Sequence, residues 1–334
     1  MEFDLPLVWA AIIGFGVFMY VFMDGFDLGV GILFPLAPGK ESRDLIMTSV
    51  APVWDANETW LVLGGAGLLA AFPLAYAIIL SALYIPLTVM LLALIFRGVA
   101  FEFRFKADRS EHWWDAAFHL GSLLATLCQG LVLGAFIQGF ETAGRDYAGG
   151  AWDWLSPFAL MTAGGLVGGY ALLGCGWIIL KTEGELRSWA YRMARPLLLA
   201  VLGFIAVVSI WTPLLDAQIA ERWFSWPNIL YLSPVPLATA ALAITLHLAV
   251  ARRWDAVPFL CTLGVFLLCY LGLAISLWPK AVPPHLTIWD VASAPASQAF
   301  LLVGTAIVIP CILFYTAYSY YVFRGKVSRE LGYH

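Results

Sequence analysis

Charged residues are scarce in this chain: Asp, Glu, Lys and Arg make up 12% of its 334 residues, where soluble domains carry about 25%. Hydrophobic residues make up 62%, and the mean hydropathy is +0.85. An ordinary soluble domain is therefore excluded. The composition indicates an all-α polytopic membrane protein, with residues 1–334 forming a single integral-membrane domain.

Signatures of several other classes are missing. The sequence has no P-loop, no G-x-G-x-x-G after a predicted strand and no basic patch with interleaved aromatics. Nucleotide and nucleic-acid binding of the usual kinds are therefore not expected. The chain opens on MEFDLPL, which is acidic where a cleavable signal peptide is basic, so no such peptide is predicted.

Cysteine offers little chemistry. The five cysteines form no C-x-x-C pair and fall within apolar segments. We interpret them as small buried hydrophobic residues, with metal or redox ligation as the less favoured alternative, and predict no metal site. They are Cys128, Cys175, Cys261, Cys269 and Cys311.

Long apolar runs are abundant, and a membrane-spanning helix needs about 20 such residues. The run over 58–96 is too long for one helix, and we divide it at Phe72-Pro73 because proline ends or kinks a helix. The first helix is too long to stand straight in lipid, so it tilts or ends as an interfacial helix. Nine transmembrane helices are predicted, at about 7–34, 57–72, 75–97, 115–138, 157–180, 196–215, 232–251, 256–277 and 299–323.

The basic residues test this count, because cytoplasmic loops carry an excess of Lys and Arg. When helix ends are assigned alternately, 15 of the 18 Lys and Arg residues fall on one side and 3 on the other. The N-terminus is therefore predicted outside and the C-terminus in the cytoplasm. The outer residues are Arg145, Arg222 and Lys280. The inner ones are Lys40, Arg43, Arg97, Arg104, Lys106, Arg109, Lys181, Arg187, Arg192, Arg195, Arg252, Arg253, Arg324, Lys326 and Arg329.

Two aspartates interrupt the first span, in FMDGFDLGVG (residues 22–31). A charged residue at the bilayer centre costs roughly 2.5–3.5 kcal/mol on the insertion scale. Asp24 and Asp27 are three residues apart and share a helix face. Asp24 lies about 25 Å along the helix, near its cytoplasmic end.

The next three helices bring more ionisable groups to the same side. Carboxylates that gather at one side of a bundle are typical of a proton or cation entry path. The groups are Asp55, Asn57 and Glu58 in VWDANETW (53–60), Arg97, Glu102 and Arg104 in FRGVAFEFR (96–104), and Asp115 and His119 in the fourth helix.

A purely structural interpretation stays open. Asp55 and Glu58 also suit the first turn of a helix, and the arginines also suit positive-inside anchors. The two aspartates of the first helix would then pair with arginines only to stabilise the bundle. This interpretation accounts for single residues, but less well for five acids that converge from three helices.

Histidine gives no support to haem binding by this chain. A haem in a helix bundle typically needs axial His or Met residues deep in the membrane, and no two histidines here have bundle spacing. No haem-binding residue is predicted. The histidines are His112, His119, His247, His285 and His334.

Several stretches carry a family resemblance. DGFDLGVG (24–31), APVWDANETWLVLGGAGLLAAFP (51–73) and FRGVAFEFR (96–104) resemble subunit II of the cytochrome bd family of quinol oxidases. LTIWDVASAPASQ (286–298) and IPCILFYTAYSYY (309–321) resemble the C-terminal end of the same subunit. The likeness covers essentially the whole chain, in order and spacing.

This resemblance implies the non-haem subunit of a bacterial inner-membrane heterodimer, which oxidises ubiquinol or menaquinol and reduces oxygen to water with cytoplasmic protons. It implies two four-helix bundles plus one peripheral helix, with the first bundle at about 7–138 and the rest at about 157–323. Two b-type haems and one d-type haem are expected in the larger subunit I, which this chain would scaffold. Family members can also hold a structural quinone, and a small accessory membrane subunit is a further candidate partner.

The proton-path residues carried over from the resemblance are Asp55, Glu58, Asp24, Asp27 and Glu102. Asp55 is the aspartate of the W-D-x-N motif and the best candidate, and Asp24 and Asp27 belong to D-G-F-D. Glu102 matches an acidic position at the end of the third helix, whereas relatives can carry an uncharged polar residue at Glu58.

Proton delivery to a buried site explains why such residues would gather. A chain of carboxylates bridged by water can carry protons where bulk water is excluded. The expected charge partners, Arg97 and Arg104, would hold some carboxylates charged while others stay protonated.

A proton-coupled secondary transporter is the alternative, since it also places acids inside a helix bundle. Transporter sites often lie near the midplane in related halves of the chain. Here the acids gather at one side, and the later helices hold no matching pair. Within the oxidases, the compact 216–230 connection is compatible with the cyanide-insensitive branch.

Overall fold

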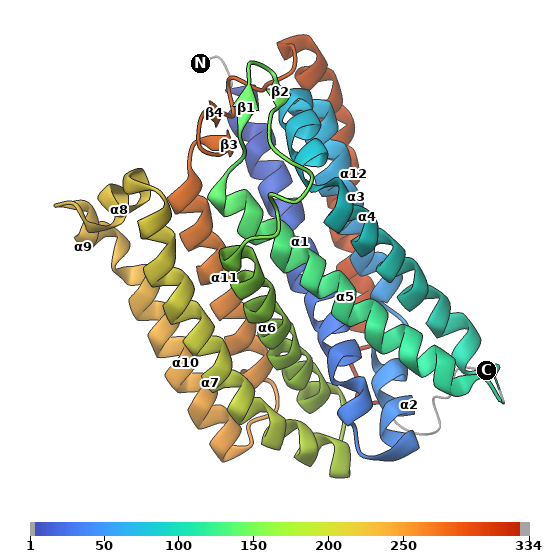
Figure 1. The fold of residues 1–334 in the computed structure, drawn as a ribbon. Coiled ribbons are helices and arrows are strands. Elements are labelled where there is room, and N and C mark those ends of the chain that lie inside the picture. Colours follow the sequence, from blue (N-terminus) through green and yellow to red (C-terminus); the bar gives the residue numbers. More distant parts are fainter. Residues whose placement is uncertain (1–3, 108, 328–334) are drawn as a thin grey trace.

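The computed structural model describes residues 4–107 and 109–327, most of them in helices (Figure 1). Arg329 and His334 lie outside the described residues. The helices are α1 (Leu5–Leu33), the 3₁₀ turn η1 (Phe34–Leu36), α2 (Gly39–Val50), α3 (Trp54–Ala71), α4 (Pro73–Arg104), α5 (Glu111–Gln138), α6 (Pro157–Lys181), α7 (Gly184–Leu215), α8 (Ala217–Phe224), α9 (Asn228–Leu232), α10 (Pro234–Arg252), α11 (Val257–Leu277) and α12 (Pro295–Val322). Two antiparallel hairpins are formed by β1 (Thr142–Ala143) with β2 (Asp146–Tyr147) and by β3 (Lys280–Val282) with β4 (Leu286–Thr287).

Eight helices in the described part of the chain are long and apolar enough to cross a membrane. The helix expected over 57–72 is not among these eight. It forms as α3, but its first turns carry Asp55, Asn57 and Glu58, which lower its hydropathy. α3 packs against α1 and α4 (Figure 1). A ninth crossing therefore stays a prediction.

The predicted division of the long apolar run is confirmed, because α4 begins at Pro73 after a break at Phe72. Three other predicted helix boundaries are wrong, because in each case the observed helix extends beyond the predicted one. α4 continues past position 97 to Arg104, α5 begins at Glu111 rather than 115, and α7 begins at Gly184 rather than 196. These extensions mix charged residues with apolar ones, so a search for continuous apolar runs stops short of them.

Short helices in the connections were not predicted. α2 follows α1 through η1; its second half buries Ile46, Met47 and Val50, while its first half carries the charged residues Lys40, Glu41, Arg43 and Asp44. α8 and α9 occupy the connection after α7, where α8 buries Ile219. α2 lies at the end of the molecule opposite the hairpins (Figure 1).

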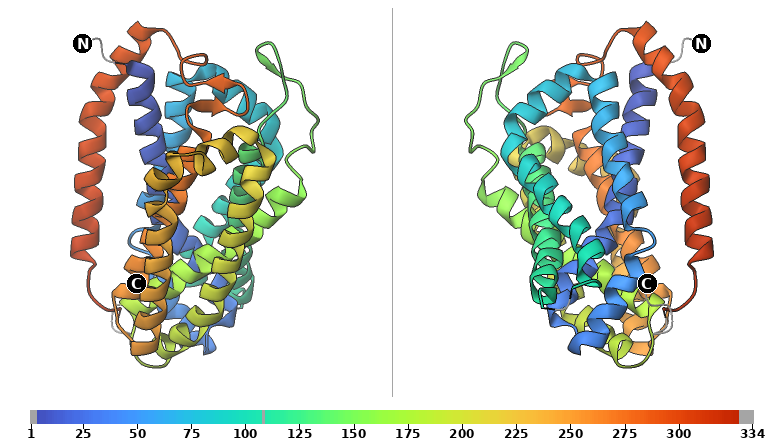
Figure 2. Two further views of the ribbon diagram at one scale, coloured as in Figure 1. Left: turned by 90° about the vertical axis from the view of Figure 1, so that its left-hand side faces the viewer. Right: turned by 90° about the vertical axis from the view of Figure 1, so that its right-hand side faces the viewer.

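The long helices pack in two groups. In the first group α3 and α5 each contact both α1 and α4, and in the second group α7 and α11 each contact both α6 and α10. α1 and α5 also pack on α6. α12 runs along the edge of the molecule beside α1 and α3 (Figure 2). Its outer apolar side chains, such as Phe300 and Phe314, are exposed.

Small residues let α1 and α6 approach closely. A Cβ at Gly29 would overlap the carbonyl oxygen of Tyr170, and a Cβ at Gly174 would lie 2.5 Å from the carbonyl carbon of Gly29. Every residue of α1 from Met23 to Leu33 is consequently buried. The two aspartates of D-G-F-D lie within this buried stretch.

Candidate functional site

Asp24 and Asp27 are completely buried, with 0% of each residue exposed. They face the group formed by α3 and α4, whereas Gly25 between them faces the ring of Tyr170 on α6. Burying a carboxylate is costly unless a cation or hydrogen-bond donors compensate it. The surroundings of these two side chains therefore decide what they can do.

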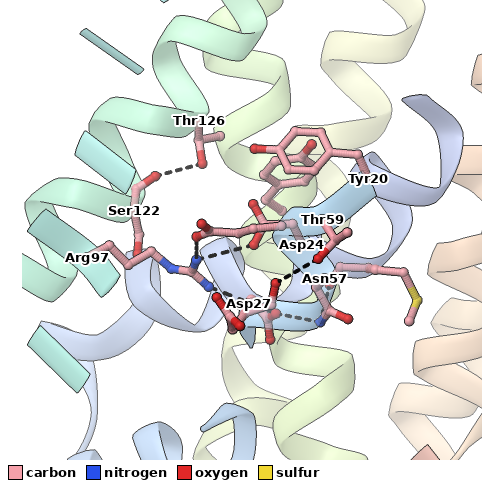
Figure 3. Close-up of polar contacts among 12 residues, drawn as sticks. Tyr20, Asp24, Asp27, Asn57, Thr59, Arg97, Ser122 and Thr126 are labelled. Carbon is pink, nitrogen blue, oxygen red and sulfur yellow. Dashed lines mark hydrogen bonds and ion pairs between the residues drawn. The ribbon is translucent and has the colours of Figure 1, made fainter. Parts of the chain in front are cut away.

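Arg97 supplies the compensating charge (Figure 3). Its Nη1 lies 3.3 Å from Asp24 Oδ1 and 2.5 Å from Glu58 Oε1, and its Nη2 lies 3.9 Å from Asp27 Oδ2. The guanidinium is completely buried and stands over the ring of Trp54, 6.0 Å from its centroid. We call Asp24, Asp27, Glu58 and Arg97 the Arg97 cluster.

Asn57 adds a directed contact to the cluster. Its Nδ2 donates to Asp27 Oδ2 at 2.6 Å and to the Met23 carbonyl at 3.3 Å (Figure 3). Its Oδ1 accepts from the hydroxyl of Tyr320, 3.0 Å away on α12. Asn57 is fully buried, and each of its polar atoms has a partner.

The cluster holds three carboxyl groups and one guanidinium. Full ionisation would leave a net charge of −2 in a region where three of the four side chains have no exposed surface. Asp27 Oδ1 also has no hydrogen-bond partner among the described residues. An excess of acids over cations suits a group of residues that gain and lose protons.

Two residues mark the outer limit of the cluster. The Glu58 side chain is 23% exposed, and Asp55, one turn earlier on α3, is exposed. Asp55 is therefore near Glu58 but outside the buried set.

The expectation that Glu102 converges with the other acids is wrong. Its side chain is 68% exposed and lies 3.8 Å from Lys106, one turn along α4. Five residues separate Glu102 from Arg97, which places them about 140° apart around the helix.

Arg104 belongs to a second cluster rather than to the first. It is buried and contacts Asp44 at 2.7 Å, Glu111 at 3.2 Å and Asp115 at 2.5 Å. Seven residues after Arg97, it shares the same helix face but lies about 10 Å further along. Arg104 was expected as a partner of the proton-path acids, and the structure gives it different partners.

Two further cations complete this second cluster. Arg43 lies 3.3 Å from Asp115 and Lys40 lies 2.5 Å from Glu111, which makes three cations for three acids. The hydrogen bond to Glu111 raises the pKa of the Lys40 ammonium above its ordinary value. This balanced network fastens α2 to the junction of α4 and α5.

Sequence reasoning missed a chain of hydrogen bonds that connects Tyr20 on α1 with Gln129 on α5 and Tyr170 on α6. Gln129 Nε2 donates to the Tyr20 hydroxyl at 2.7 Å, and the Tyr170 hydroxyl donates to Gln129 Oε1 at 2.8 Å. Tyr20 precedes Asp24 by one helical turn, a spacing that was visible in the sequence. Gln129, Tyr170 and Tyr320 come from distant helices, and no local pattern marks them.

The sequence matches the family described as cytochrome bd terminal oxidase subunit II over residues 5–323. The chain belongs to this family. It is 31% identical to cytochrome bd ubiquinol oxidase subunit 2 of Bacillus subtilis (strain 168), a match that covers 98% of this chain and 97% of that protein. It is 27% identical to cytochrome bd-I ubiquinol oxidase subunit 2 of Escherichia coli (strain K12), covering 98% and 96%.

A solved structure, that of the bd oxidase from Geobacillus thermodenitrificans, shows the same fold. Its matching chain superposes with a TM-score of 0.75 at 17% identity, over 96% of this chain and 97% of that one. This cytochrome bd subunit II is thus a multi-pass protein of the bacterial inner membrane and a subunit of a respiratory quinol oxidase complex. These comparisons do not support the transporter alternative.

The described histidines of this subunit II give no support for a haem, on which the bd oxidase family depends. His112, His247 and His285 are exposed, and the partly buried His119 has its Nδ1 3.0 Å from the carbonyl of Gly31. Within the described residues no group of three or more His, Cys, Asp or Glu is placed to hold a metal ion. We therefore derive no step of the oxidase reaction through a haem in this chain.

Proposed function

We propose that this chain scaffolds the haem-bearing subunit I of a bd-type oxidase and provides its cytoplasmic proton-uptake path. The Arg97 cluster is the observation that carries the proposal. It sets three acids around one fully buried cation: Asp24 and Asp27 are fully buried, and Glu58 reaches the surface. Because the acids outnumber the cation, some of them can be protonated and can carry protons.

The proposed path begins at Asp55. This exposed acid sits on the first turn of α3, one turn before Glu58, so protons would pass from Asp55 to Glu58 and then to Asp24 and Asp27. Arg97 would stabilise whichever carboxyl of the cluster is ionised. Glu102 has no place in this path, because its exposed side chain points away from the cluster.

We propose nine crossings, with the N-terminus outside and the C-terminus in the cytoplasm. Lys40 on α2 contacts Glu111 at the start of α5, and Asp44 on α2 contacts Arg104 at the end of α4. The ends of α1 and α4 therefore lie on one side, so the chain has to return between them, and α3 is the segment that can do so. The outer basic residues Arg145 and Lys280 lie in the hairpins at the opposite end (Figure 1).

The two helix groups, with α12 at the edge beside α1 and α3, support the arrangement of two four-helix bundles plus one peripheral helix, at about 7–138 and 157–323. Quinol oxidation, by ubiquinol or menaquinol, and reduction of oxygen are assigned to subunit I with its b- and d-type haems. A structural quinone and a small accessory subunit remain compatible with this assembly.

The experiment that tests this assignment is extraction of the chain from its native membrane in a gentle detergent. We expect a larger subunit with b- and d-type haem absorption bands to co-purify, together with quinol-driven oxygen uptake. A colourless chain that purifies alone in good yield would contradict the proposed function.

A further inference from the structure

The peripheral helix places one side chain against Asn57, which contacts the Arg97 cluster. The hydroxyl of Tyr320 on α12 donates to Asn57 Oδ1 at 3.0 Å, and Asn57 Nδ2 donates in turn to Asp27 Oδ2 at 2.6 Å. Hydrogen bonds thus connect α12 through α3 to the buried carboxyl of α1. Tyr320 was not recognised as a site residue in the sequence and has no role in the path proposed above.

The two ends of the Asn57 carboxamide are chemically different, so a partner that holds the oxygen also aims the nitrogen. With Oδ1 held by Tyr320, the Nδ2 hydrogens face Asp27 Oδ2 and the carbonyl of Met23. If the amide were rotated by half a turn, its oxygen would face the Asp27 oxygen. That contact would be repulsive unless Asp27 carried a proton.

The ring of Tyr320 is held separately from its hydroxyl. It meets the rings of Phe26 and Trp177 edge-on, with centroid separations of 6.5 and 6.3 Å. Phe26 and Trp177 themselves stack at 4.2 Å. A phenylalanine at position 320 would keep these contacts and lose only the hydrogen bond to Asn57.

We propose that Tyr320 is a positioning residue, which fixes the Asn57 carboxamide so that its N–H group favours the ionised form of Asp27. A hydrogen bond donated to a carboxylate stabilises the charged form. Among the described residues, the ionisable groups that face Asp27 are Asp24 on α1, Glu58 on α3, Arg97 on α4 and Tyr320 on α12. This inference rests on the proposed function and names a further residue that tunes the same site.

The test is carbodiimide labelling of the purified two-subunit complex across a range of pH, with each labelled carboxyl identified by peptide mass spectrometry. Carbodiimides modify protonated carboxyls in apolar surroundings and leave carboxylates unmodified. In Tyr320→Phe we expect labelling of Asp27 at neutral pH to rise about 2- to 10-fold, the size of one lost hydrogen bond. The pH profile of oxygen uptake should shift with it.

Matched variants separate this effect from a general disturbance of α12. Tyr321→Phe changes the adjacent, exposed tyrosine, and Asp27 labelling in this variant should equal that of the wild type. Asn57→Ala removes the hydrogen bond to Asp27 itself and should raise Asp27 labelling at least as much as Tyr320→Phe does. Combining the two should add nothing to Asn57→Ala, because Tyr320 acts on Asp27 only through Asn57.

The outcomes distinguish the two proposals. If Asp27 labelling in Tyr320→Phe equals that of the wild type, the role of Tyr320 is overturned, whatever the activity of other variants. Wild-type oxygen uptake by Asp27→Asn would instead overturn the proton path, because Asp27 would then be dispensable for it.

Discussion

Arg97 is the residue on which the buried cluster depends. It is the only cation that the described residues place within 4 Å of Asp24, Asp27 or Glu58. Its guanidinium has five N–H donors in a fixed plane, which lets it approach several carboxyls at once. A lysine would offer a single compact charge and could not contact all three acids in this way.

We predict that Arg97→Met destabilises the assembled complex by about 3–5 kcal/mol, because it leaves the buried Asp24 and Asp27 and the partly buried Glu58 without a cation. Thermal unfolding of the purified complex, followed by the haem absorbance, would measure the loss. Lys106→Met is the control, since Lys106 pairs with Glu102 at the surface, and its effect should stay within about 0.5 kcal/mol. Equal thermal midpoints for the two variants would contradict the central role of Arg97.

Sequence spacing predicted part of this site correctly. Asp24 and Asp27 share a face because they are three residues apart, and Glu58 and Arg97 join them because α3 and α4 pack as neighbouring antiparallel helices. The prediction for Glu102 is wrong because its place in the motif does not indicate which side of α4 it occupies. Tyr320 could not be predicted, since its contact with Asn57 depends on how α12 lies against α3.

At the scale of elements, the approach of α1 to α6 holds the two helix groups together. Gly29→Ala would drive a methyl group into the Tyr170 carbonyl, which belongs to the backbone and cannot rotate away. We expect destabilisation of about 1–3 kcal/mol, the usual cost of overpacking, measured as a lower thermal midpoint. Gly203→Ala on α7 meets nothing within 4 Å and should be neutral or slightly stabilising, so an equal loss there would disprove this explanation.

A second element-scale prediction concerns pH at the connection between α7 and α8. Burial opposes ionisation of Asp216, but hydrogen bonds from Lys280 Nζ at 3.0 Å and the Gln218 N–H at 2.9 Å outweigh it and lower the pKa of this carboxyl below 3.8. A lowered folded-state pKa gives stability that is present above about pH 4 and is lost as the pH falls further.

Asp216→Asn keeps the side-chain cap on α8 but removes its charge. We therefore expect the free energy of unfolding to fall by about 1 kcal/mol at pH 7. The difference in thermal midpoint between the variant and the wild type should narrow toward pH 3. A difference that stays constant over this range would show that the ion pair with Lys280 is not its source.

The elements themselves were partly predictable. The proline at position 73 identified the end of α3, because its geometry acts locally. The extra helices α2 and α8 and the early start of α7 were missed, because charged residues interrupt their apolar ones. Such amphipathic segments need a helical period to be recognised rather than a long apolar run.

For the whole molecule, the topology makes a prediction of its own. Cysteines introduced at Lys40 and Lys106 should both react with an impermeant maleimide only from the cytoplasmic side, and a cysteine at Arg145 only from outside. Lys40 and Lys106 share a side only if α3 crosses the membrane, since α3 and α4 both lie between them. Labelling of these two positions from opposite sides would reduce the count to eight crossings.

The central claim is that protons for oxygen reduction enter through the Arg97 cluster, and Glu58 tests it most directly because it connects the cluster to the surface. The measurement is steady-state quinol-driven oxygen uptake by the purified complex carrying Glu58→Gln, compared with Glu102→Gln. We predict that Glu58→Gln slows uptake about tenfold or more, equivalent to about 1.4 kcal/mol in the barrier, with haem spectra unchanged, while Glu102→Gln keeps the wild-type rate. Wild-type uptake by Glu58→Gln, or an equal loss in both variants, would contradict the account.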